Sequence, residues 1–72
     1  MRKNLRWLYT FCTVAKVLNY KRAAEELFLT PSAISHQISE LELQLGAKLF
    51  QRTTRSMVLT SQGLKLYQKI RV

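Results

Sequence analysis

Short polar side chains recur at helical spacing in the middle of the chain. At about 100° per residue, Ser32, Ser35, His36 and Ser39 share one face of a helix. That face has no acid and no long hydrocarbon, whereas a solvated helix face usually carries Glu and Lys. Small polar residues near a helix N-terminus allow close approach to another surface, and the helix dipole there favours anions. An ordinary Ser-rich surface is the alternative interpretation.

The other reactive residues do not support catalysis. The chain has no Asp, no Gly-rich phosphate loop, one Cys and one His. Cys12 falls on an apolar stripe, and Ser35 and His36 are too close in sequence to act as a nucleophile and its oriented base. One Cys with one His makes neither an intrachain disulfide nor a cysteine-rich zinc site. We therefore expect no enzyme, cofactor or metal, and the cysteine usage favours a reducing cytoplasm.

Charge indicates a polyanionic partner. Twelve Lys and Arg residues against four acids give a net charge of +8. The charges occur in blocks: residues 1–24 hold six cations, residues 25–42 hold all four acids, and residues 43–72 hold six more cations. Such a balance on a compact chain is typical of binding to nucleic acid or to an acidic membrane surface. The cations lie on several segments rather than one helix, which disfavours the membrane, and no stretch approaches the ~20 apolar residues of a membrane span.

Helices and a hairpin must position these residues within one small domain with a thin core. Spacing and capping signals predict helices over residues 4–18, 20–28, 31–45 and 61–72. Asn19 and Thr30 are good N-caps, Pro31 suits a first helical position, and Gly46 suits a left-handed stop. Residues 49–50 and 57–59 predict two short strands, and the polar turn over residues 51–56 carries Arg52 and Arg55.

Apolar spacing predicts which helix faces are buried. The first helix has a stripe of six residues, and the third helix has a narrower one of four: Leu5, Leu8, Phe11, Cys12, Ala15 and Leu18, then Ile34, Ile38, Leu41 and Leu45. The last helix turns a second set inward: Gly63, Leu66, Tyr67 and Ile70. Its remaining apolar residues, Leu64 and Val72, point elsewhere, so we expect a partner helix to bury them in a dimer.

A short helix joined by a tight turn to a third helix with a small polar face describes a helix-turn-helix, and a basic hairpin after it makes the fold winged. We therefore predict a mainly α winged helix-turn-helix with a three-helix core and a short β-hairpin wing. The third helix then fits the major groove of DNA. Arg52 and Arg55 can reach phosphates or the minor groove, and Lys21 and Arg22 can contact the backbone phosphates that flank the major groove. Ordinary solvated charge is the alternative for any single cation.

The sequence resembles the LysR-type transcriptional regulators over nearly its whole length. The resemblance rests on two continuous runs, Asn19–Leu27 (NYKRAAEEL) and Thr30–Ile38 (TPSAISHQI). Spaced matches follow: Leu41-Glu42, Leu45-Gly46, Leu49-Phe50, Arg52, Arg55, Leu59-Thr60 and Gly63. Within the family, the chain is similar to regulators of the glycine-cleavage-activator kind.

The resemblance implies a bacterial regulator that binds double-stranded operator DNA as a dimer or a higher oligomer. It places five residues next to base edges: Thr30, Pro31, Ser32, Ser35 and His36. It places five others on the DNA backbone: Lys21, Arg22, Ser39, Arg52 and Arg55. Residues 1–60 then form the DNA-binding domain, and residues 61–72 begin a C-terminal linker and dimerisation helix. The effector domain of the family has no counterpart in this sequence. Members often have Arg where this chain has His36, so the base preference there is in question.

Two expectations about partners remain. The last helix has only about three turns, which is short for a coiled-coil-like interface between two copies. We therefore expect a weak homodimer. A nonspecific, chromosome-associated basic protein is the competing interpretation of the function, and a salt-dependent affinity without sequence preference would favour it.

Overall fold

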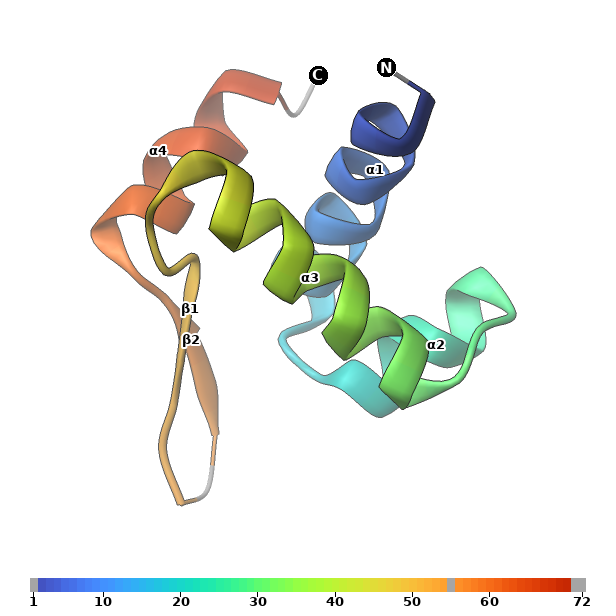
Figure 1. Ribbon diagram of the computed structural model, residues 1–72. Helices are drawn as coiled ribbons and strands as arrows, with labels where there is room; N and C mark the ends of the chain where they lie inside the picture. Colours follow the sequence, from blue (N-terminus) through green and yellow to red (C-terminus); the bar gives the residue numbers. More distant parts are fainter. Residues whose placement is uncertain (1, 55, 71–72) are drawn as a thin grey trace.

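The computed structural model describes residues 2–54 and 56–70 (Figure 1). In chain order the elements are α1 (Arg2–Val17), α2 (Tyr20–Leu27), α3 (Pro31–Leu45), β1 (Phe50–Arg52), β2 (Met57–Leu59) and α4 (Ser61–Ile70). This order confirms the predicted winged helix-turn-helix. Within the described ranges, no helix is long and apolar enough to cross a membrane.

The helices pack around α3, and the hairpin projects from them. In Figure 1, α3 crosses the front of the molecule, with α1 behind it, α2 beside its beginning and α4 near its end. Contacts join α1 to both α2 and α3, and α4 packs against α1 and β2. The hairpin points away from the end of the molecule where the chain begins and ends (Figure 1). The wing and the beginning of α3 are therefore presented together, opposite the termini.

Local capping explains the helix-turn-helix boundaries. The side-chain oxygen of Asn19 accepts the Arg22 N–H at 2.9 Å and begins α2. The Thr30 hydroxyl accepts the Ala33 N–H at 3.1 Å and begins α3, with Pro31 in its first turn. Gly46, at φ 68°, ends α3 in the left-handed conformation as predicted. The end of α2 differs from the prediction by one residue, because Phe28 leaves the helix as a left-handed cap at φ 58°.

The predicted core stripe of α1 is partly wrong. Phe11 and Ala15 are buried, but Leu5 is 68% exposed and Leu18 is 37% exposed. Thr10, Thr13 and Val14 are buried instead. Because α1 touches α2, α3 and α4, its buried face is wider than a leucine stripe and is turned toward these partners. The threonines enter at little cost because each donates a hydrogen bond: Thr10 to the Gln37 side chain at 2.6 Å, and Thr13 to the Tyr9 carbonyl at 3.1 Å.

The stripe of α3 is confirmed except at its end. Ile34, Ile38 and Leu41 are buried against the other helices, whereas Leu45 is 49% exposed. The last turn of α3 faces the flank of α4, where Leu45 borders a shallow crevice with Leu66 rather than a closed core.

The hairpin is longer on its first strand than predicted. β1 and β2 are antiparallel, with Phe50 opposite Leu59 and Arg52 opposite Met57. Arg52 therefore belongs to the strand rather than to the turn. The Thr53 N–H donates to the Ser56 carbonyl at 2.8 Å, and the Ser56 N–H donates to the Thr53 hydroxyl at 2.9 Å. These bonds close a loop over residues 53–56, and position 55, where the sequence places the second wing cation, lies outside the described residues.

Thr60 and Gly63 join α4 to the beginning of the wing. Thr60 donates its hydroxyl to the Lys48 carbonyl at 2.6 Å and accepts the Gly63 N–H at 3.0 Å as the cap of α4. The Thr60 N–H also donates to the Leu49 carbonyl at 3.0 Å. Gly63 is buried, and a Cβ there would overlap the carbonyl oxygen of Leu49. The missing side chain therefore lets α4 lie directly against the backbone that leads into β1.

Candidate nucleic-acid interface

The first half of α3 presents the predicted polar face. Ser32, His36 and Ser39 are exposed and Ser35 is half-buried, while Ile34 and Ile38 on the other side are fully or almost fully buried. Residues 31–39 contain no Asp, Glu, Lys or Arg. The exposed surface of this segment is therefore made of short hydroxyls and one imidazole, which offer hydrogen bonds without a formal charge that would favour one sign of ligand.

The two residues that begin α3 have a structural role as well. The Thr30 hydroxyl accepts the Ala33 N–H as the helix cap, so its oxygen is oriented by the helix while its O–H can still donate to another group. Pro31 has no N–H to leave unsatisfied in the first turn. Both residues are exposed, and they place the beginning of α3 at the surface.

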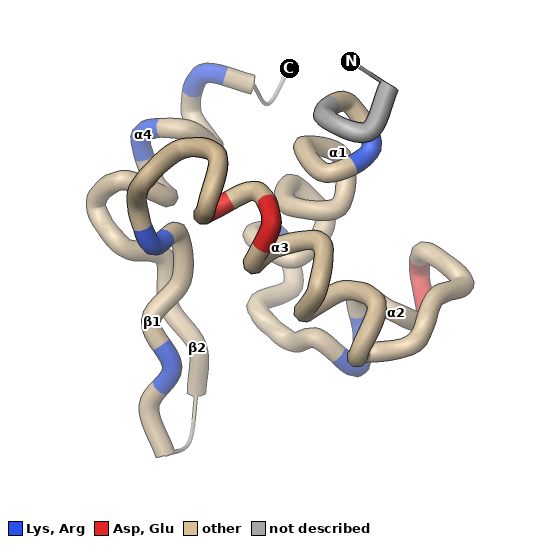
Figure 2. Tube along the Cα trace, viewed as in Figure 1, with Lys and Arg blue, Asp and Glu red and all other residues tan. Residues whose placement is uncertain are grey.

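Exposed cations flank this uncharged surface. Lys21 and Arg22 lie in the first turn of α2, and Arg52 ends β1. In Figure 2 blue segments lie on β1 and at the beginning of α2, close to the beginning of α3, while the red segments of α3 lie in its second half. The predicted phosphate-binding residues with described positions are thus on elements that border the polar face.

A crevice between α3 and the wing brings several of the predicted residues together. Ser35 and Ser39 enter it from α3, and Arg52 enters it from β1. Its other lining residues are Tyr20, Glu42, Lys48, Phe50, Gln51 and Thr60. Lys21 and Arg22 do not line this crevice, but they directly follow Tyr20, which does. The surface therefore has a central polar helix with exposed cations on the wing and at the beginning of α2.

The Arg52 guanidinium stacks over an aromatic ring. Its central carbon lies 5.4 Å from the centroid of the Tyr20 ring, within the range of a cation–π contact. Burial raises the pKa of the Tyr20 phenol, the Glu42 carboxylate raises it further, and Arg52 lowers it. The net shift is upward, so the phenol stays neutral at physiological pH and adds no negative charge beside the cation.

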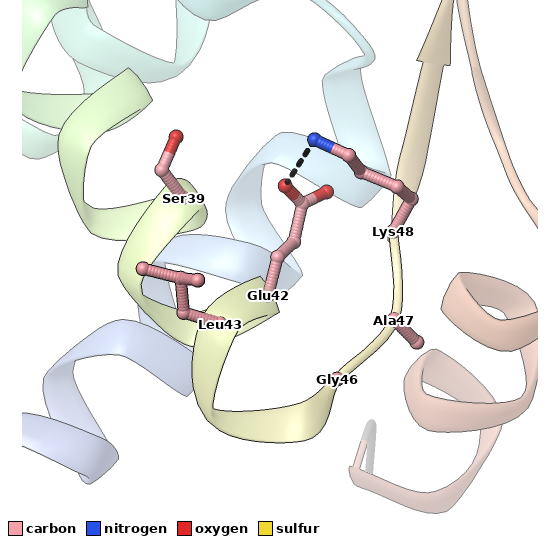
Figure 3. Close-up of a pocket in the computed structure, with 6 residues that line it drawn as sticks. All are labelled: Ser39, Glu42, Leu43, Gly46, Ala47 and Lys48. Carbon is pink, nitrogen blue, oxygen red and sulfur yellow. Dashed lines mark ion pairs between the residues drawn. The ribbon is translucent and has the colours of Figure 1, made fainter.

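Glu42 fastens the beginning of the wing to α3. Its carboxylate accepts the Leu49 N–H at 2.8 Å and lies 3.8 Å from the Lys48 ammonium (Figure 3). The Glu42 side chain is 13% exposed, whereas that of Lys48 is 83% exposed. The ammonium therefore remains largely in solvent, and Lys48 adds a cation to the rim of a pocket that Ser39 and Glu42 also line (Figure 3).

Sequence reasoning missed the roles of Tyr20, Glu42 and Lys48. A signal for Glu42 was present: it lies in the last turn of a helix, where the macrodipole disfavours an acid, so a carboxylate there indicates a specific partner. Tyr20 and Lys48 carried no comparable local signal, because their neighbours in space lie on other elements.

The remaining predicted positions lie away from this surface or outside the described chain. Leu64 is 46% exposed on α4, as expected for a residue off the core face, and Val72 lies outside the described residues. Cys12 is half-buried, and burial raises the pKa of its thiol, which disfavours the nucleophilic thiolate. In the described ranges, no group of three or more His, Cys, Asp or Glu side chains could hold a metal ion.

Comparison with protein families connects this geometry to known regulators. The model of the bacterial regulatory helix-turn-helix protein, lysR family, matches residues 5–64. The glycine cleavage system transcriptional activator of Escherichia coli K12 is 48% identical over 67 residues, which are 93% of this chain and 22% of that protein. The transcriptional regulator YcaN of the same organism is 46% identical over 71 residues, 99% of this chain and 24% of that protein. This chain thus spans about a quarter of the length of these relatives.

A solved protein–DNA complex has the same fold. The BenM DNA-binding domain bound to benA site 1 DNA superposes with a TM-score of 0.85 at 34% sequence identity, over 90% of this chain and 73% of that one.

Proposed function

Since this chain belongs to the LysR family of bacterial regulatory helix-turn-helix proteins, we propose that it binds operator DNA in a sequence-specific manner, with α3 in the major groove and the β1–β2 wing on the backbone or in the minor groove. The main support for this proposal is the exposed face of residues 31–39, which has no formal charge and is bordered by exposed cations. Hydrogen-bonding groups without charge can discriminate bases, while the flanking cations attract phosphates of any sequence.

The dimensions support this docking. The 15 residues of α3 correspond to roughly 22 Å of helix, and the major groove, about 12 Å wide, admits one α-helix. The BenM domain, which superposes on this chain, was solved in complex with DNA. In our proposal, the residues that approach base edges are Thr30, Pro31, Ser32, Ser35 and His36. The residues that contact the backbone are Lys21, Arg22, Ser39, Arg52 and Arg55.

The experiment that tests the proposal is selection from a random duplex pool. Bound sequences are recovered and the preferred duplex is titrated against scrambled DNA of equal length. A specific domain should bind its preferred site at least about a thousandfold more tightly than scrambled DNA. The net charge of +8 favours a second candidate, a nonspecific chromosome-associated protein. For either candidate the proposed compartment is the cytoplasm. Equal affinity for all sequences, with a steep salt dependence, would establish that candidate instead.

Arg52→Ala should weaken binding to every duplex by a similar factor. Because the wing cation neutralises a phosphate, its loss should reduce the slope of log K against log salt by about one unit. Affinity measured between low and moderate salt on the preferred and scrambled duplexes gives that slope. A loss of sequence preference with an unchanged slope would instead make Arg52 a base-reading residue.

We also propose that residues 1–60 form the DNA-binding domain and that residues 61–72 begin a linker and dimerisation helix. Leu64, half-exposed on α4, and Val72 would then face a second copy. Burying a few such side chains contributes roughly 1.5–3 kcal/mol each, whereas association costs an estimated 4–15 kcal/mol, so the two nearly cancel.

The expected result is a weak dimer, largely monomeric at micromolar concentration and shifted toward the pair by DNA with two half-sites. Sedimentation equilibrium from micromolar to millimolar protein measures this association. Leu64→Ser should shift it further toward monomer, and Leu43→Ser, an exposed leucine on α3, is the matched control. A tight dimer at low micromolar concentration, or a strict monomer at millimolar concentration, would contradict the expectation.

A further inference from the structure

The outer end of the wing depends on side chains for its position. Each strand has three residues, and an isolated two-stranded hairpin of this size is marginal in water. Phe50 and Met57 are buried, and the Glu42 carboxylate holds the Leu49 N–H. Phe50 and Leu49 lie at the base of the hairpin, and Met57, which pairs with Arg52, anchors its outer end in the core. These contacts hold the backbone of β1, but another contact must orient the exposed Arg52 side chain relative to the recognition helix.

Arg52 makes that contact. It is the last residue of β1, and its guanidinium lies over the ring of Tyr20, the first residue of α2. Tyr20 and Arg52 together line two crevices. One separates the wing from Ser35 and Ser39 of α3, and the other separates the wing loop from the turn between α1 and α2. The ring therefore stands between the helix-turn-helix and the wing.

The cation–π contact with Tyr20 holds the guanidinium without using its hydrogen-bond donors. The ion pairs found among the described residues join Lys16 to Glu26 and Lys48 to Glu42, and neither includes Arg52. A guanidinium that stacks on its flat face keeps the N–H groups along its edge directed outward. An ion pair with a nearby carboxylate would instead compete with an incoming phosphate for the same donors.

We propose that Tyr20 is a positioning residue for DNA binding. Its ring holds the Arg52 guanidinium beside α3, so that this cation is already ordered when it meets a DNA phosphate. This rests on the proposed DNA-binding function. Tyr20 acts through Arg52 and makes no contact with DNA of its own. Ordering a long side chain on binding costs about 0.5–1.5 kcal/mol, which corresponds to roughly a twofold to tenfold change in affinity. Tyr20 removes that cost in advance.

The test compares Tyr20→Leu, Tyr20→Phe, Arg52→Ala and the double variant Tyr20→Leu/Arg52→Ala. The probe is a labelled random-sequence duplex of roughly 21 base pairs, two helical turns. Tyr20→Leu should bind about twofold to tenfold more weakly than wild type with an unchanged salt slope, because the charge is still present. Tyr20→Phe keeps the ring and should bind like wild type. In the Arg52→Ala background, Tyr20→Leu should have no further effect. Tyr9→Leu, an exposed tyrosine on α1, is the matched control.

A second readout separates positioning from loss of fold. The side-chain resonances of Arg52 should show an upfield ring-current shift in wild type and in Tyr20→Phe, and lose it in Tyr20→Leu. Thermal unfolding and far-UV dichroism identify any variant that does not fold. If Tyr20→Leu does not fold, the Arg52 resonances of wild type and Tyr20→Phe can still be compared with each other.

Three results would overturn the proposal. An equal loss in Tyr20→Phe and Tyr20→Leu would assign a direct role to the hydroxyl. An equal loss from Tyr20→Leu with and without Arg52 would show that Tyr20 does not act through Arg52. Wild-type affinity in Tyr20→Leu would remove the role altogether. Since these ratios are measured on random DNA, they stand even if the wild-type chain proves to have no sequence preference, which is the failure of the proposed function.

Discussion

Replacing Gly63 by alanine should lower the free energy of unfolding by about 3 kcal/mol. Gly63 is a buried position inside α4, and a Cβ there would overlap the carbonyl oxygen of Leu49 and press on the Leu59 side chain. The backbone oxygen cannot rotate away as a side chain would, so α4 or the segment leading into β1 must shift. Alanine gains about 1 kcal/mol over glycine in a helix interior, which does not offset the overlap.

The size of the effect is large for so small a domain. A stability of roughly 0.05–0.15 kcal/mol per residue gives a 72-residue chain only about 4–11 kcal/mol in total. Urea denaturation measures the change as a lower midpoint at a similar slope. DNA affinity should also fall, because the shifted segment carries Lys48 and leads into the wing.

Gly46→Ala is the matched control. Gly46 has a positive φ of 68° but no atom within 4 Å of the position of a Cβ, so alanine there meets conformational strain without overlap. Its expected cost is about 1 kcal/mol. A Gly63→Ala variant as stable as Gly46→Ala would mean that α4 does not lie against the Leu49 backbone as closely as described.

Alanine at Ser35 or His36 should reduce affinity for the preferred duplex by about 1–3 kcal/mol each. Both side chains lie on the uncharged polar face of α3, and Ser35 also lines the crevice beside the wing. Each substitution removes a group that contacts bases in the proposed complex. The loss of affinity for scrambled DNA should therefore be smaller than the loss for the preferred duplex. Isothermal titration or anisotropy on both duplexes measures the two losses side by side.

Gln44→Ala is the control for these variants. Gln44 is exposed on α3, but at 100° per residue it lies off the polar face, so its loss should leave both affinities unchanged. Equal losses on preferred and scrambled DNA for Ser35→Ala and His36→Ala would show that α3 does not read bases.

Much of the helix-turn-helix was predictable because its signals are local. A helix begins where a side chain can cap it and ends where the chain can turn, and both conditions depend on residues within one turn. Thr30 with Pro31 and Gly46 therefore set the bounds of α3, which the structure has as predicted. Asn19 likewise begins α2. The polar face of α3 follows from the same periodicity, and the structure exposes it on the helix where it was predicted.

The details of the interface required the tertiary structure, because they join residues distant in the chain. The buried face of α1 could not be read from its leucines, since Thr10 is buried by packing against α3 and satisfied by Gln37. Helical spacing places a residue on a face, but the neighbours decide whether that face is covered. Arg52 was predicted in a turn and lies in a strand over the Tyr20 ring. The uncharged reading face was thus determined by sequence periodicity, whereas the position of the wing cation beside it was decided by contacts between separate elements.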